Sequence, residues 1–132
     1  MTNNMIYLAS PMKSTADIKK NVDCPQKFKR NAEIADKLKS AGLDIFLPQE
    51  NQAATDEETL KKELEVIRQS EFMIILLSDT RGIYLEAGYA KALGKKIYAI
   101  KLPESRELSG WGKCWYDYIA EDVDDLINYL KH

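Results

Sequence analysis

The feature that most constrains the fold is a run of six consecutive apolar residues, Phe72 to Leu77, near the middle of the chain. A strand with one face in water alternates apolar and polar side chains, whereas a strand covered on both faces does not. The run is far shorter than a membrane span and has the length of an ordinary strand. It therefore predicts a strand buried on both faces, as in a parallel sheet covered by helices.

Strand and helix patterns alternate along the rest of the chain. Further strands are predicted at Met5 to Ala9, Leu43 to Leu47, Lys96 to Ile100 and around Trp115 to Ile119. Helices are predicted from Pro25 to Ala41, from the capping box at Thr55 through Ile67, from Ile83 to Leu93 and from Asp122 to Leu130. Short connections between such elements imply right-handed crossovers and a doubly wound, three-layer α/β fold. We expect one domain, residues 1–132, with a parallel sheet of flavodoxin-like strand order 2-1-3-4-5.

Composition removes several kinds of chemistry. His132 is the only histidine and the last residue, so an imidazole base and a histidine-rich metal site are nearly excluded. Cys24 and Cys114 lie far apart without a CxxC motif, which predicts neither a zinc site nor a disulfide framework. Carboxylates, hydroxyls, tyrosines, lysines and arginines remain as the groups that can do chemistry.

Charge and hydropathy restrict the partners and the compartment. The net charge of −2 includes no basic excess, which argues against a nucleic-acid polymer as partner. No apolar run approaches the length of a membrane span, and the first residues lack the basic region of a signal peptide. We therefore expect a cytoplasmic protein with no membrane partner.

Ligands of doubly wound folds bind beyond the carboxyl ends of the strands, near the switch point between the first and third strands. The loops at that edge contain neither GxGxxG nor GxxxxGK[ST], so no standard nucleotide-binding motif is present. The segment Ser10 to Ser14 offers hydroxyls and Lys13, which could hold a sugar hydroxyl or a phosphate, or simply form a polar loop. The four loops expected at this edge are Ala9 to Asp23, Pro48 to Thr55, Ser78 to Ile83 and Lys101 to Gly112.

Glu86 is the first candidate catalytic residue. It falls in the first turn of the helix after the most buried strand, where the helix dipole favours an ionised carboxylate. The small residues around it, Gly82, Ala87, Gly88 and Ala90, allow close approach of a ligand or of the sheet. Position alone is equally compatible with a solvated glutamate that only benefits from the dipole.

Glu63 is the second candidate, because it interrupts the apolar stripe formed by Leu60, Leu64 and Ile67. A carboxylate on a buried face is costly unless it is paired, so it either reaches solvent, pairs with a neighbouring lysine or serves a site. The first turns of its helix lie at the same sheet edge as Glu86. Two carboxylates in one cleft are the arrangement that cleaves glycosidic bonds.

Two segments together suggest a family. They are Tyr7-Leu8-Ala9-Ser10-Pro11 and Gly82 to Lys95, which reads GIYLEAGYAKALGK. The chain resembles the nucleoside 2-deoxyribosyltransferase family, whose fold is flavodoxin-like and whose members are oligomers. The resemblance implies that Glu86 is the nucleophile that attacks C1′ of the deoxyribose, that Tyr7 orients it, and that Glu63 occupies the position of a base-recognising aspartate. It further implies substrate contacts from Ser10, Pro11, Lys13, Asn51, Gln52, Asp79, Thr80 and Gly82.

The chain departs from the family pattern in ways that leave the substrate open. Transferases of free nucleosides usually carry an aspartate six residues before the nucleophile, where this chain has Thr80, with Asp79 one place earlier. A related branch that hydrolyses deoxynucleoside 5′-monophosphates has a phosphate-binding serine there and an arginine at the place of Lys13. The segment Trp115 to Tyr118 is also similar to that branch. Because Glu63 is longer than aspartate, a preference for purines or pyrimidines does not carry over.

The first hypothesis is therefore cleavage of the N-glycosidic bond of a 2′-deoxynucleoside through a deoxyribosyl ester of Glu86, followed by transfer to another nucleobase. It requires no metal and no organic cofactor; its partners are a nucleoside or nucleotide, a free nucleobase and further copies of the chain. Alternatives are hydrolysis of nucleoside 5′-monophosphates, attack on a ribosyl-nicotinamide bond, and a nucleotide-binding module without turnover.

Overall fold

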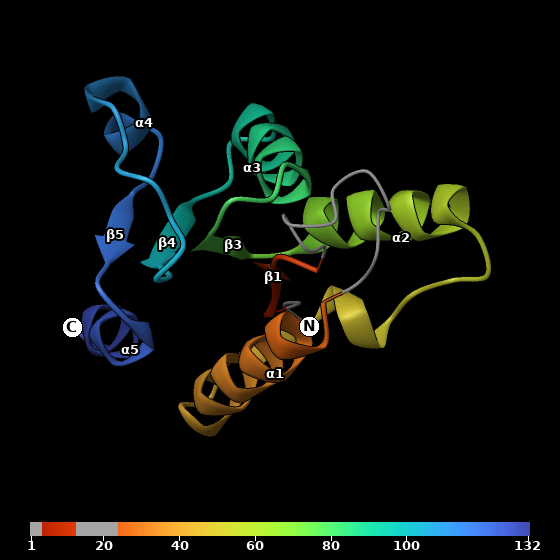
Figure 1. Cartoon of the computed structure of the whole chain (residues 1–132), viewed down its shortest axis with the longest axis horizontal. Helices are drawn as coiled ribbons and strands as arrows, with labels where there is room; N and C mark the ends of the chain where they lie inside the picture. Colours follow the sequence, from red (N-terminus) through yellow and green to blue (C-terminus); the bar gives the residue numbers. More distant parts are fainter. Residues whose placement is uncertain (1–3, 13–23) are drawn as a thin grey trace.

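The computed structural model describes residues 4–12 and 24–132 of the chain. Within these residues one parallel sheet has the strand order β2-β1-β3-β4-β5, which confirms the predicted fold class and strand order. The elements are β1 (Met5–Ala9), α1 (Pro25–Ser40), β2 (Asp44–Phe46), η1 (Pro48–Glu50), α2 (Asp56–Gln69), β3 (Phe72–Leu77), α3 (Gly82–Ala92), β4 (Ile97–Lys101), α4 (Gly110–Cys114), β5 (Tyr118–Ala120) and α5 (Val123–Lys131) (Figure 1).

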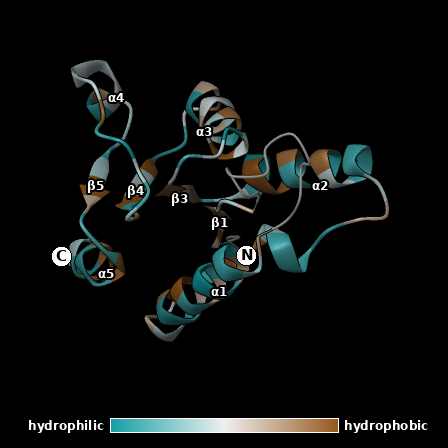
Figure 2. Cartoon of the chain, in the orientation of Figure 1, coloured by the Kyte–Doolittle hydropathy of each residue, from teal (hydrophilic) through white to brown (hydrophobic). Residues whose placement is uncertain are grey.

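Helices cover both faces of this sheet. Helices α1 and α5 lie on one side of it, and α2 and α3 lie on the other (Figure 1). In Figure 2 the central strand β3 is hydrophobic along its length, whereas α1 and α2 carry both hydrophilic and hydrophobic residues. This agrees with the prediction from Phe72 to Leu77, because a strand between two helical layers has no face in water.

The alternation of side chains along β1 brings one tyrosine to the layer of α2 and α3. Ile6 and Leu8 belong to the core under α1 and α5. Tyr7 and Ala9, which point to the opposite face, belong to the core under α2 and α3. Because β1 lies between β2 and β3, Tyr7 is placed at the switch point of the sheet.

The structure corrects the sequence prediction mainly near the C-terminus. The predicted strand around Trp115 to Ile119 begins only at Tyr118, because the short helix α4 precedes it. Ser109 caps that helix by accepting a hydrogen bond from the backbone amide of Gly112. Strand β2 is shorter than predicted, since Pro48 starts the 3-10 turn η1 directly after Leu47. None of the helices in the described part of the chain combines the length and hydrophobicity needed to span a bilayer.

Candidate active site

Tyr7 and two glutamates from different helices converge above the switch point. The Tyr7 hydroxyl lies 3.0 Å from Glu63 Oε2, which comes from α2. The same hydroxyl is hydrogen-bonded to Glu86 Oε2, which comes from the first half of α3. Tyr7 itself is fully buried. The structure thus brings together the three residues that the sequence marked for chemistry.

The number of protons available to these groups is limited. A phenol carries one proton and can fully donate to only one carboxylate, so its second hydrogen bond is best satisfied when the other carboxyl keeps a proton. Burial raises the pKa of Glu86 from 4.5 to about 8, the hydrogen bond from Tyr7 opposes this rise, and hydrogen bonding with Glu63 and its charge add to it. Burial and the two glutamates also raise the pKa of Tyr7. At neutral pH we therefore expect a neutral phenol and a carboxyl pair that holds one proton.

The raised pKa of Glu86 predicts how stability depends on pH. In the unfolded chain Glu86 loses its proton near pH 4.5, whereas in the folded protein it keeps the proton up to about pH 8. Its contribution to stability is thus complete below pH 4.5 and is lost as the pH rises through 8. We expect Glu86→Gln to be more stable than the wild type at pH 8.5, on the order of 3 kcal/mol, and the difference to shrink towards pH 5.

Denaturant unfolding of both proteins between pH 5 and 9 measures this difference. Glu33→Gln, which changes an exposed glutamate of α1, is the matched control and should show no such trend. Glu63→Gln should weaken the trend, because it removes the negative charge that contributes to the raised pKa of Glu86. Parallel pH profiles for the wild type and Glu86→Gln would contradict the burial of an ionisable pair.

A cavity of about 270 Å³ opens beside the two glutamates. Its polar lining, apart from Glu63 and Glu86, consists of Ser10 and Thr80. Such a mixed wall suits a small organic ligand with one polar part and one flat apolar part. The apolar lining is formed by Met12, Leu60, Leu64, Ile83 and Leu85. Gly82, the first residue of α3, completes the wall.

Two hydroxyl groups of the cavity lack a hydrogen-bond partner among the described residues. They are Ser10 Oγ and Thr80 Oγ1, from side chains that are only 4% and 9% exposed. Helix α3 begins beside them at Gly82 without a side-chain cap. Buried hydroxyls are normally paired, and the first amides of a helix attract acceptors and negative charge. This end of the cavity is therefore suited to a polar, acceptor-rich group of a ligand.

Two other predicted contact residues, Asp79 and Pro11, do not line the cavity but contact residues behind it. The carboxylate of Asp79 is paired with Lys27 Nζ at 3.0 Å and does not line the cavity. The backbone carbonyl of Pro11 accepts a hydrogen bond of 2.7 Å from Asn31 Nδ2. Both residues therefore belong to the frame of the site rather than to its surface.

The loop after β2 approaches the cavity only indirectly. Asn51 Nδ2 donates to the backbone carbonyl of Leu47 at 2.8 Å and so closes its own turn. Gln52 Nε2 lies 3.4 Å from Met12 Sδ, and Met12 is the residue that lines the cavity. Lys13, the predicted phosphate ligand, lies outside the described residues.

Sequence reasoning missed a buried polar clamp behind the site. Asn31 is fully buried on α1, and its amide donates to the Pro11 carbonyl and, at 3.1 Å, to Gln49 Oε1. Gln49 in turn donates to the backbone carbonyl of Phe28 at 2.8 Å. The available signal was helical spacing, because Asn31 shares the inward stripe of Phe28 and Ala35.

Comparisons with known proteins find a family match by sequence. A sequence model of the nucleoside 2-deoxyribosyltransferase family matches residues 6–130. No curated protein sequence matches the chain significantly.

Solved structures share the fold at low sequence identity. The 2-deoxyribosyltransferase of Bacillus psychrosaccharolyticus superposes with a TM-score of 0.77 at 24% identity, over 95% of this chain and 91% of that one. The 2-deoxyribosyltransferase of Leishmania mexicana gives a TM-score of 0.66 at 18% identity, over 98% and 99% of the two chains. The CMP N-glycosidase BcmB of Clostridium botulinum gives a TM-score of 0.63 at 17% identity, over 97% of this chain and 99% of that one.

Proposed function

Since the chain belongs to the nucleoside 2-deoxyribosyltransferase family, we propose that it cleaves the N-glycosidic bond of 2′-deoxynucleosides through a deoxyribosyl ester of Glu86 and transfers the sugar to a second nucleobase. The observation that carries this proposal is the Tyr7 hydroxyl between the carboxyl groups of Glu63 and Glu86. Retaining glycosidases use such a carboxyl pair, one member as nucleophile and the other for the proton.

The first step breaks the bond between C1′ and the base. Glu86, ionised, attacks C1′ with a carboxylate oxygen, and the electron pair of the broken bond leaves with the base nitrogen. In the reactive form the one proton of the pair has passed from Glu86 to Glu63, which donates it to the departing base. Tyr7 hydrogen-bonds the nucleophile and keeps it directed at C1′. Desolvation of Glu86 increases the reactivity of the carboxylate once it is ionised.

The second step reverses these roles. A nitrogen of the incoming base attacks C1′ of the ester, its proton passes to the Glu63 carboxylate, and Glu86 departs as a carboxylate. Water in the place of the base gives hydrolysis by the same route. The protons and electron pairs balance with Tyr7, Glu63 and Glu86 alone, so the proposal needs no metal and no organic cofactor.

A second candidate, hydrolysis of nucleoside 5′-monophosphates, is supported by the hydroxyls of Ser10 and Thr80, which have no hydrogen-bond partner in residues 4–12 and 24–132. Neutral donors beside the start of α3 suit a phosphate, whereas an aspartate side chain would repel it. Asp79, the acid nearest in sequence, is instead paired with Lys27. The structural relative BcmB is described as a CMP N-glycosidase.

Product analysis tests both candidates. The protein is incubated with 2′-deoxynucleosides and with their 5′-monophosphates, each with and without a second free base, and products are separated by chromatography. A new nucleoside that contains the second base supports transfer, and free base without exchange supports hydrolysis. Tight binding without release of base over hours would contradict both and favour a nucleotide-binding module.

The oligomeric state belongs to the same proposal. We expect a homodimer or a larger homo-oligomer, as for the members of the family, and light scattering of the purified protein measures it directly.

A further inference from the structure

We propose that Arg30 and Glu104 are positioning residues for the nucleophile. Through Ser78 they hold the loop of residues 78–81, which carries Thr80 and leads into the helix of Glu86. This inference rests on the proposed function, because it assigns the pair a part in that reaction. The two side chains come from elements distant in sequence, the first half of α1 and the loop after β4.

The contact between the pair has the geometry of a strong ion pair. Two guanidinium nitrogens of Arg30 donate to the two carboxylate oxygens of Glu104, at 2.8 and 2.6 Å. The side chains are 29% and 22% exposed, so water screens the pair only in part. Such a planar, bidentate fork fixes orientation as well as distance. Burial acts to raise the pKa of Glu104, but hydrogen bonds led by the one from Arg30 bring it below its ordinary value.

The ion pair is connected to the catalytic loop by one hydroxyl. Ser78 Oγ lies 3.0 Å from Glu104 Oε2 and 3.1 Å from Asp79 Oδ1. Asp79 is in turn paired with Lys27 of α1. Tyr84 of α3 donates to the backbone carbonyl of Ser78 at 2.6 Å. The loop is thus held from α1 in one helical layer and from α3 in the other.

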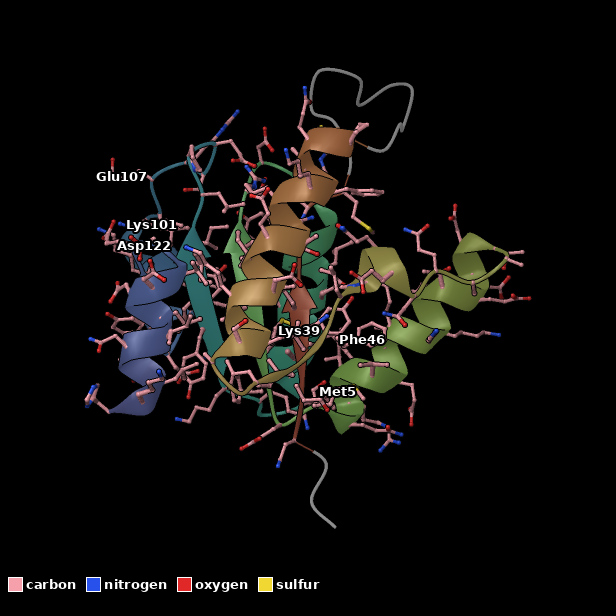
Figure 3. All side chains as sticks on the ribbon, turned by 90° about the horizontal axis from the view of Figure 1, so that it is seen from below. Met5, Lys39, Phe46, Lys101, Glu107 and Asp122 are labelled. Carbon is pink, nitrogen blue, oxygen red and sulfur yellow. The ribbon has the colours of Figure 1, made fainter. Side chains whose placement is uncertain are left out.

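The loop of residues 78–81 lies at the edge of the sheet where the contacts from α1 and from the loop after β4 meet it. In Figure 3 the beginning of α1 lies at the same edge of the sheet as Lys101, the last residue of β4. Ser78 and Asp79 leave β3 at this edge, and α3 begins without a side-chain cap. A helix start without a side-chain cap lacks one stabilising hydrogen bond, so contacts from other elements contribute more to holding the loop in place. A shift of about 1 Å in a reacting group can lower a rate by about 100-fold.

The test compares three variants with a matched control. Glu104→Gln keeps the size of the side chain but removes its charge, and Arg30→Lys keeps the charge but removes the fork. Ser78→Ala leaves the ion pair in place and removes the hydroxyl that links it to the loop, together with the contact of that hydroxyl with Asp79. Glu121→Gln is the control, because Glu121 also pairs with a basic residue of this sheet edge, Lys101, at 3.0 Å. We measure kcat and KM for the best substrate together with the melting temperature.

We expect Glu104→Gln and Ser78→Ala to lower kcat about tenfold or more at nearly unchanged KM. The kcat of Arg30→Lys should lie between that of the wild type and that of these two variants, and the control should keep the wild-type kcat. The double variant of Arg30→Lys and Glu104→Gln should lose no more than Glu104→Gln alone. A lower melting temperature with wild-type kcat would show a purely structural pair and overturn the inference. Ser78→Ala decides the matter if Glu104→Gln does not fold. A wild type without turnover would instead contradict the proposed function.

Discussion

Replacing Glu86 by glutamine should lower kcat/KM at least 1000-fold, which corresponds to about 4 kcal/mol of activation free energy. The amide has nearly the size of the carboxylate but cannot form the sugar ester. Tyr7 can still donate to the amide oxygen, so the frame around the site should persist. Release of base from a deoxynucleoside or its monophosphate, followed by chromatography, measures the effect.

Binding and stability separate loss of chemistry from loss of structure. Calorimetry should give nearly the same substrate affinity for Glu86→Gln as for the wild type, and the variant should be the more stable protein at alkaline pH. The exposed-site control, Glu33→Gln, should keep full activity. Activity of Glu86→Ala or Glu86→Gln within tenfold of the wild type would rule out Glu86 as the nucleophile.

The second large effect concerns the substrate. We expect Thr80→Asp to lower kcat/KM for a nucleoside 5′-monophosphate about 100-fold or more, and to change it only severalfold for the free nucleoside. Thr80 lines the cavity and is 9% exposed, so a carboxylate there would face the phosphate with little screening. Two unit charges about 4 Å apart at an effective dielectric constant of about 20 repel by about 4 kcal/mol.

Conservative variants at the same position define the cause. Thr80→Ser keeps the hydroxyl and should retain activity on the monophosphate. Thr80→Val keeps the shape of the side chain but lacks the hydroxyl, so it should lose part of that activity. Initial rates with matched pairs of nucleoside and monophosphate give the ratio directly. Equal losses on both substrates with Thr80→Asp would contradict a phosphate site beside Thr80.

Much of this architecture could be predicted because it depends on periodicity. The apolar run Phe72 to Leu77 predicted the central strand, and the alternation of strand and helix patterns predicted the parallel sheet. The strand order was predicted as that of a flavodoxin-like fold, and the structure confirms it.

Glu63 interrupts an apolar stripe of α2, which marks it as unusual from the sequence alone. Glu86 was predicted in the first turn of its helix, but α3 begins at Gly82 and Glu86 is its fifth residue, just beyond the first turn. Alternation along β1 places Tyr7 on the face covered by α2 and α3, whereas its part beside Glu86 was implied by the family resemblance. Its hydrogen bond with Glu63 was not predicted.

The rest depends on contacts that have no local signature. Whether Asp79 or Thr80 faces the cavity is set by the turn of the chain after β3 and by the pairing of Asp79 with Lys27. Arg30 and Glu104 are 74 residues apart, and neither lies in a motif. Helix α4 was not predicted, because its first residues fall in the segment Lys101 to Gly112 that was expected to be a loop, although Ser109 supplies a cap.

Trapping of the covalent intermediate tests the central claim most directly. The protein is mixed with a deoxynucleoside or its 5′-monophosphate, quenched with acid within the first turnover, and digested for peptide mass spectrometry. The account predicts that the peptide containing Glu86 gains the mass of a deoxyribosyl group from a nucleoside, or of a deoxyribosyl 5′-phosphate group from a monophosphate. Glu86→Gln should show no adduct. Base release without any adduct, or an adduct on Glu63 instead, would contradict it.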